Sequence, residues 1–179
     1  VRALFDLVAD EYDNVGIPFF GPIAAGLVDA VGVRPGDRAL DLGCGRGAAS
    51  VLLADAVGPA GALTATDLSP AMVEHARAAL SGRLANLAVG VGDAGDPDLA
   101  AGGFDVVVAS LVVFFLPHPD TAVARWVRLL APGGRLGLST FGAQSKEWLA
   151  MEEALLGFMP PADPRTVGPA SPFASDAGV

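Results

Sequence analysis

Residues 39–48 read Ala39-Leu40-Asp41-Leu42-Gly43-Cys44-Gly45-Arg46-Gly47-Ala48. The apolar residues up to Leu42 are typical of a central parallel strand that is covered on both faces. The glycines predict a sharp turn at Gly43, close approach of the backbone to a ligand at Gly45, and tight packing of a helix on the strand at Gly47. The helix expected over 46–57 would point free amide hydrogens at that ligand. The stretch therefore predicts a binding site for a nucleotide-like ligand.

Acidic residues around this turn narrow the kind of ligand. The Gly-x-Gly-x-x-Ala pattern over 43–48 alone also satisfies the loose dinucleotide-binding fingerprint. Asp41 stands two residues before the first glycine, Asp67 ends the next expected strand, and Asp93 follows the strand after that. Carboxylates at the rim of a site favour hydroxyl groups and an ammonium group over a pyrophosphate.

Two further motifs follow the glycine turn in order, Thr66-Asp67-Leu68-Ser69 and Gly92-Asp93-Ala94. Together with the stretch 41–47, they resemble the class I S-adenosylmethionine-dependent methyltransferase family. A strand pattern over 104–108 and an Ala-Pro-Gly-Gly turn over 131–134 extend the resemblance to about residues 5–141. The resemblance implies an α/β fold: a Rossmann-like, doubly wound, mostly parallel sheet in an α/β/α sandwich.

The 179 residues are expected to form a single domain in three parts. The parts are N-terminal helices or a lid at 1–34, a cofactor-binding core at 35–141, and a substrate-side helix with a proline-rich loop at 142–179. Strands are expected at 39–42, 62–66, 87–91, 104–110 and 135–140, and helices at 2–13, 22–31, 46–57, from 69 onwards, 120–130 and 148–158. The family has seven strands, whereas only five are found here and the C-terminal ones are missing; the sequence also lacks an initiating methionine. We therefore expect a portion of a longer protein.

Composition limits the partners and the location. A net charge of −9 argues against a nucleic-acid partner, because such binding relies on clustered Lys and Arg. The longest apolar run, 106–116, is shorter than the roughly 20 residues that span a bilayer, so no membrane partner is expected. The single cysteine, Cys44, excludes an internal disulfide and is consistent with the cytoplasm. The oligomeric state is left open.

The resemblance implies roles around S-adenosylmethionine, with S-adenosylhomocysteine as the product. Asp67 would accept hydrogen bonds from ribose hydroxyls, and Asp41 would bind the methionyl ammonium group or hold the turn through loop amides. Met72 would pack on adenine or in the core, and Asp93 would recognise the adenine amino group or cap a turn. Tyr12 would contact the cofactor from an N-terminal segment or belong to a covering helix. The expected cofactor-binding residues are Tyr12, Asp41, Leu42, Gly43, Cys44, Gly45, Gly47, Asp67, Leu68, Met72, Gly92, Asp93, Ala94 and Ser110.

No catalytic residue and no metal site is assigned from the sequence. The methyl group on a sulfonium is already activated, so the protein must mainly align the acceptor and exclude water. His118 is a candidate general base; the alternative is an exposed turn before a helix capped by Asp120. Cys44 is not required as a nucleophile.

The expected acceptor is a small molecule methylated at an O, N or C atom. Phe114 and Phe115 replace histidines of many family members and favour an apolar or aromatic acceptor. Phe19 and Phe20 would line the substrate pocket or fill the core, and Phe141 would face the same pocket. Signatures of nucleic-acid and protein-arginine methyltransferases are absent from the sequence. One alternative is an NAD(P)-dependent oxidoreductase, although this sequence lacks the Tyr-x-x-x-Lys pair that the short-chain type needs. The other alternative is a non-catalytic cofactor-binding module.

Overall fold

The computed structural model describes residues 2–13, 18–142, 146 and 150. Val1–Ser139 forms one compact unit and Thr140–Val179 forms a second. The helix expected at 148–158 and the proline-rich loop after it lie outside the described residues, apart from residue 150.

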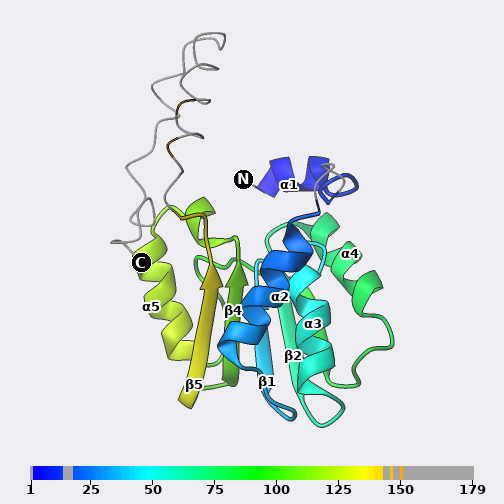
Figure 1. The fold of residues 1–179 in the computed structure, drawn as a ribbon, viewed down its shortest axis with the longest axis vertical. Coiled ribbons are helices and arrows are strands. Elements are labelled where there is room, and N and C mark those ends of the chain that lie inside the picture. The colour runs from blue at the N-terminus through cyan, green and yellow to red at the C-terminus, as the bar shows by residue number, and fades with distance from the viewer. Residues whose placement is uncertain (1, 14–17, 143–145, 147–149, 151–179) are drawn as a thin grey trace. The chain divides into compact units, whose positions relative to one another are not determined.

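The first unit contains five parallel strands in the order β3-β2-β1-β4-β5. Figure 1 shows β2, β1, β4 and β5 of this sheet side by side. The strands are β1 Arg38–Leu42, β2 Ala62–Asp67, β3 Leu87–Val91, β4 Phe104–Ser110 and β5 Leu130–Ser139. The helices are α1 Arg2–Val8, α2 Phe20–Val31, α3 Ala48–Val57, α4 Pro70–Leu80, the 3₁₀ helix η1 Val113–Phe115, and α5 Pro119–Leu129. The chain winds from β1 to β3 in one direction and then returns to β4 and β5 on the other side, as in a doubly wound sheet.

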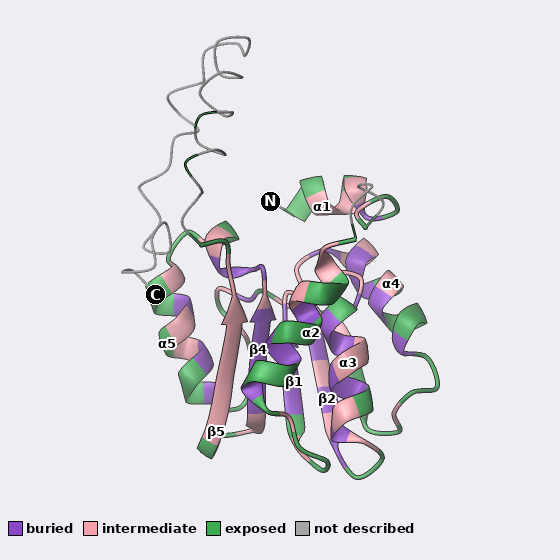
Figure 2. Cartoon of the chain, in the orientation of Figure 1, coloured by how far each residue is buried: buried purple, intermediate pink, exposed green. Residues whose placement is uncertain are grey.

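The core lies between the central strands and the helices packed on them. Leu40 in β1 and Val106–Ala109 in β4 are fully buried, as Figure 2 shows for these strands. Leu53 and Val57 of α3 pack in one cluster with Val106 and Val108 of β4. Each fully buried Leu or Val side chain stabilises the fold by roughly 1.5–3 kcal/mol, so these continuous apolar runs fix the strands at the sheet centre.

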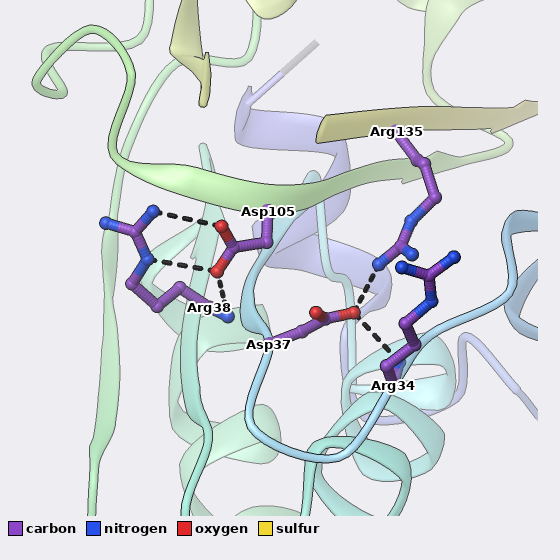
Figure 3. A network of polar contacts seen from close by, with 5 residues as sticks. All are labelled: Arg34, Asp37, Arg38, Asp105 and Arg135. Carbon is purple, nitrogen blue, oxygen red and sulfur yellow. Dashed lines mark hydrogen bonds and ion pairs between the residues drawn. The ribbon is translucent and has the colours of Figure 1, made fainter. Parts of the chain in front are cut away.

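The amino ends of the strands are joined by arginine–aspartate contacts (Figure 3). The Arg38 side chain donates to both carboxylate oxygens of Asp105 at 3.0 Å. Asp37 accepts from the Arg34 backbone amide at 2.8 Å and also from the guanidinium of Arg135 in β5. These contacts connect β1, β4 and β5 at the amino ends of the strands, opposite their carboxyl ends.

Several expectations about element bounds and caps were wrong. The first helix ends at Val8 rather than 13, and α3 begins at Ala48 because Gly47 is its N-cap, with φ of 97°. The helix after β4 is not capped by Asp120: Pro119 takes its first position, where a missing amide hydrogen costs nothing, and His118 becomes the N-cap residue.

The start of the fifth strand also differs from the expectation of 135. Phe104 pairs with Leu130, whereas Val106 already pairs with Arg135. The Pro-Gly-Gly segment expected as a turn before the strand is therefore an irregularity within β5, with Gly133 at φ of 79°.

Within the described ranges, no helix is both long and apolar enough to cross a membrane. In the same part of the chain, no cluster of His, Cys, Asp and Glu side chains is arranged to hold a metal ion.

Candidate functional site

A pocket of about 280 Å³ lies beyond the carboxyl ends of the strands, at the position where the winding of the sheet reverses between β1 and β4. This is where open parallel sheets bind ligands. Its walls are formed by Phe5, Tyr12, Asp13, Phe20, Asp41, Gly43, Cys44, Gly45, Arg46, Ala48, Ala49, Asp67, Leu68, Met72, Asp93, Ala94, Ser110, Leu111, Val112, Phe115, Leu116 and Pro117.

The glycine turn after β1 forms the floor of this pocket. Gly43 has φ of 69°, and a Cβ there would lie 2.5 Å from Cγ2 of Val112. The backbone amides of Gly43 and Cys44 both donate to the carbonyl of Thr66, at 2.8 and 2.9 Å. Gly45 has φ of 53°, and a Cβ at this position would meet no atom within 4 Å, so the backbone faces open space there. Gly43 thus makes the turn, and Gly45 presents bare backbone to the pocket.

Gly47 has a different neighbour from the one expected. A Cβ on Gly47 would lie 3.5 Å from Cα of Ala76, which belongs to α4 and not to the preceding strand. Its φ of 97° starts α3. Gly47 is therefore required by its backbone conformation at the start of α3, because a Cβ would make only ordinary contact with α4, and it does not line the pocket.

Asp67 holds the glycine turn and the start of α4 together. One carboxylate oxygen accepts from the Gly45 amide at 2.8 Å, and the other accepts from the Ser69 amide at 2.9 Å. Burial raises the pKa of Asp67, and these amide hydrogen bonds oppose the rise. Each carboxylate oxygen keeps a further lone pair, so binding of ribose hydroxyls stays a prediction.

Asp41 is the most deeply buried acid of the pocket, with 1% of its surface exposed. Its Oδ2 accepts from the hydroxyl of Ser50 in α3 at 2.5 Å. Its Oδ1 is buried and has no hydrogen-bond partner among the described residues. Burial raises the pKa of Asp41 to about 7. The alternative in which Asp41 holds the turn through loop amides does not fit, because the side-chain partner comes from α3.

Cys44 has the environment of a structural thiol. Its side chain is buried, and Sγ lies 3.6 Å from the carbonyl of Gly45. Burial, followed by the nearby carboxylates of Asp41 and Asp67, raises the pKa of the thiol. A thiol held in its neutral form is a poor nucleophile, in agreement with the sequence interpretation.

Several expected residues meet on the wall formed by α4 and the loop after β3. Met72 is 1% exposed and lines the pocket, so it belongs both to the core and to the wall. Asp93 is exposed and accepts from the Gly95 amide at 2.7 Å, which is the turn contact named as its alternative role. The carbonyl of Ala94 accepts from Nε1 of Trp126 at 2.7 Å, which fixes this loop against α5.

Four of the expected cofactor-binding and catalytic residues do not line the pocket: Leu42, Gly47, Gly92 and His118. Phe114, expected near the acceptor, does not line it either. Leu42 is fully buried at the end of β1. The backbone amide of Gly92 donates to the carbonyl of Asp67 at 2.9 Å, so Gly92 supports the backbone at the end of β2. His118 is exposed at the start of α5.

An aromatic cluster from three separate segments closes one side of the pocket. Phe5 of α1 meets Phe115 edge-on at a centroid distance of 5.2 Å. Tyr12 stacks on Phe20 at 4.9 Å and meets Phe5 at 5.7 Å. Burial raises the pKa of Tyr12. The cluster forms an apolar surface of the kind on which planar groups pack.

Polar contacts tie this N-terminal segment to the glycine turn and to α4. The guanidinium of Arg46 donates to the carbonyl of Asp10 at 3.0 Å and lies 3.4 Å from the carboxylate of Asp13. The hydroxyl of Ser69 donates to the carboxylate of Asp6 at 2.5 Å. Residues 2–13 are thereby held beside the pocket.

The sequence predicts that residues 111–118 cross the mouth of the site, and the lining confirms this for Leu111, Val112, Leu116 and Pro117, whereas Ala48 and Ala49 were not named as lining residues. Leu111 has φ of 57°, a left-handed conformation rarely taken by leucine. Its amide donates to the carbonyl and to Oγ of Ser139, each at 3.1 Å. No local sequence pattern predicts such a conformation, because the contact that holds it comes from β5.

Comparison with known proteins agrees with this geometry. A family model described as "Methyltransferase domain" matches residues 39–134. Nocamycin O-methyltransferase of Saccharothrix syringae is 43% identical over 137 residues, covering 76% of this chain and 49% of that protein. Aklanonic acid methyltransferase of Streptomyces sp. (strain C5) is 39% identical over 141 residues, covering 78% of this chain and 64% of that protein. The chain thus spans about half to two thirds of these relatives' length.

A solved structure of a putative methyltransferase is also similar to this chain. The structure of a putative S-adenosyl-L-methionine-dependent methyltransferase from Methanococcus maripaludis has a TM-score of 0.61 at 27% identity, covering 85% of this chain and 71% of that chain.

The parallel sheet, the glycine turn and the acids at the carboxyl ends of β1 and β2 define a Rossmann-like nucleotide-binding α/β protein. Within that class, the chain belongs to the class I S-adenosylmethionine-dependent methyltransferase family. The family expected from the three sequence motifs is confirmed.

Proposed function

We propose that this chain is the cofactor-binding part of an enzyme that transfers a methyl group from S-adenosylmethionine to an O, N or C atom of a small molecule. One observation carries the proposal: Asp41 lines the pocket, and its buried Oδ1 has no hydrogen-bond partner among the described residues. An unpaired buried oxygen of this kind is costly. The ammonium group of the cofactor would pair with it and remove that cost.

The remaining walls fit the other parts of the cofactor. Asp67 and Met72 both line the pocket, which supports a role for Asp67 in accepting from ribose hydroxyls and for Met72 in packing on adenine. Asp93 stands at the rim, where it would accept from the adenine amino group. Among the described lining residues, Arg46 alone is cationic, and it is paired with Asp13 at 3.4 Å. A pyrophosphate would meet no free cation from these residues, which disfavours NAD.

The chain's own residues would act by binding, orientation and exclusion of water. When bound, the cofactor supplies a methyl group that its sulfonium charge already activates. The aromatic cluster of Phe5, Tyr12, Phe20 and Phe115 would cover the site. We assign no general base, since His118 is exposed and outside the pocket wall.

The aromatic cluster also supports an apolar or aromatic acceptor. The relatives reported above are named for methylating nocamycin and aklanonic acid, so a small-molecule acceptor is the natural expectation for this chain. The net charge of −9 disfavours a nucleic-acid acceptor. The single cysteine supports a cytoplasmic location.

Calorimetric titration with S-adenosylmethionine, S-adenosylhomocysteine and NAD tests the proposal. We expect saturable binding of the first two ligands, and weaker binding to Asp67→Asn, since an amide cannot accept at both of its ends. Asp105→Asn, at the far end of the sheet, is the matched control and should bind normally. Transfer of labelled methyl to an aromatic acceptor library would then establish catalysis.

Binding of NAD alone would overturn the proposal in favour of an oxidoreductase. Saturable cofactor binding without transfer to any acceptor would favour the non-catalytic binding module.

A further inference from the structure

A buried serine beside the pocket has no role in the function described so far. Ser50 lies in α3, is fully buried, and does not belong to the pocket wall. Its hydroxyl donates to Oδ2 of Asp41 at 2.5 Å. A hydroxyl in an otherwise apolar helix face costs free energy unless it is used, and here its partner is the acid that the proposed function needs most.

This contact makes the two oxygens of Asp41 unequal. Oδ2 is occupied by Ser50, whereas Oδ1 is buried without a partner in the part of the chain that the structure describes. Without the hydroxyl, only the backbone amide of Ser50 would still bond to the carboxylate, so its rotation about the last side-chain bond would be restrained less. With it, the carboxylate plane is fixed and one oxygen is left for a ligand.

We infer that Ser50 is a positioning residue for cofactor recognition: by holding Oδ2 of Asp41, it directs Oδ1 toward the ammonium group of the cofactor's methionyl part. The inference rests on the proposed function and deepens it. Ser50 would thus favour ligands that carry an amino acid group, although its own side chain does not line the pocket.

The charges around Asp41 make the contact with Ser50 more important. Burial raises the pKa of Asp41, the carboxylate of Asp67 on β2 raises it further, and the Ser50 hydrogen bond lowers it. On the β4 side the paired residue is the apolar Val108. The other ionisable groups of the pocket wall are Tyr12, Asp13, Cys44, Arg46 and Asp93. Since the hydroxyl favours the charged form, Ser50→Ala should keep Asp41 protonated to higher pH.

Two ligands separate positioning from a merely structural role. S-Adenosylhomocysteine carries the amino acid group, whereas 5′-methylthioadenosine has the same adenosine and thioether without it. Ser50→Ala should weaken binding of the first about tenfold, the scale of a hydrogen bond to a charged group, and leave binding of the second unchanged. The pH at which S-adenosylhomocysteine binding is half lost should also move upward.

Ser69→Ala is the matched control. Ser69 is also fully buried and also donates to an aspartate at 2.5 Å, but its partner is Asp6 on α1. This variant should change the affinities for both ligands by the same factor and leave the pH profile in place.

The outcomes distinguish this inference from the proposed function. If the unsubstituted chain binds no S-adenosylhomocysteine, the proposed function fails. If it binds normally and Ser50→Ala weakens both ligands equally, or neither, the proposed function stands and the positioning role of Ser50 is overturned.

Discussion

The two ends of the sheet carry aspartates with opposite kinds of partner. At the amino ends of the strands, Asp37 and Asp105 accept hydrogen bonds from arginine side chains (Figure 3). At the carboxyl ends, Asp41 accepts from a serine hydroxyl, and Asp67 accepts from backbone amides. Neither of these two acids forms an ion pair within the described part of the chain.

The pKa values differ in the same way. Hydrogen bonds from Arg38 lower the pKa of Asp105 to about 2, whereas burial raises the pKa of Asp41 to about 7. The amino-end acids are complete as they stand and serve the fold. Asp41 is buried without a cation, which is costly in the free protein and useful when a positively charged ligand arrives, whereas Asp67 is partly buried and already accepts from two backbone amides.

The largest expected effect is a difference in stability and ligand binding between two glycine substitutions, Gly43 at the carboxyl ends of the strands and Gly36 at their amino ends. Gly43→Ala and Gly36→Ala both place alanine at positive φ, at 69° and 91°, which costs about 1–2 kcal/mol each. Only at Gly43 would the new Cβ also collide with Val112, adding about 1–3 kcal/mol. Denaturant unfolding should therefore show the greater loss for Gly43→Ala, and calorimetry should show loss of S-adenosylhomocysteine binding for that variant alone. If Gly43→Ala and Gly36→Ala changed stability and binding equally, the role of Gly43 in the turn beside the pocket would be contradicted.

The second effect is the pH dependence of cofactor binding. Because the free protein holds a proton on Asp41 below about pH 7, binding of an ammonium group requires that proton to leave. Affinity for S-adenosylhomocysteine should thus fall as the pH drops below 7, by up to about tenfold per pH unit. Asp105 stays charged over this range, so Asp105→Asn should show the same profile as the unsubstituted chain. A flat profile between pH 5 and 7 would argue against a role for Asp41.

A smaller effect is expected for the arginine of the glycine turn. Arg46→Met removes the contacts with Asp10 and Asp13, and partly exposed contacts of this kind are worth about 1 kcal/mol or less. Affinity for S-adenosylhomocysteine should fall about threefold, and residues 2–13 should be cleaved faster by protease in the presence of ligand. Arg38→Met, at the amino end, should change neither measurement. Unchanged proteolysis of Arg46→Met would mean that its contacts do not hold the segment in place.

Much of the sheet could be predicted because its signals are local. β3 Leu87–Val91 and β4 Phe104–Ser110 have the bounds that their apolar runs predict, and Ser69 caps α4 as its sequence position indicates. Gly43 and Asp41 were found for the same reason, since the glycine turn and its preceding acid form a short continuous pattern.

What could not be predicted depends on contacts between distant segments. The early start of β5 follows from its pairing with Phe104, and the strained backbone of Leu111 follows from its bonds to Ser139. The pairing of Ser50 with Asp41 joins a helix to a strand. Periodicity and turn chemistry report on neighbours in sequence, so such contacts leave no local signal.

One paired measurement tests the difference between the two ends most directly: the melting temperature at pH 8 and the affinity for S-adenosylhomocysteine, for Asp41→Asn and Asp105→Asn. The raised pKa of Asp41 means that its carboxylate destabilises the folded protein as the pH rises from about 4 through 7, whereas the lowered pKa of Asp105 means that its carboxylate stabilises the fold above about pH 4.

We therefore predict a crossover. Asp41→Asn should melt at the same or a higher temperature than the unsubstituted chain and lose most of its affinity. Asp105→Asn should melt at a lower temperature and bind normally. Normal binding by Asp41→Asn, or loss of binding by Asp105→Asn, would contradict the account.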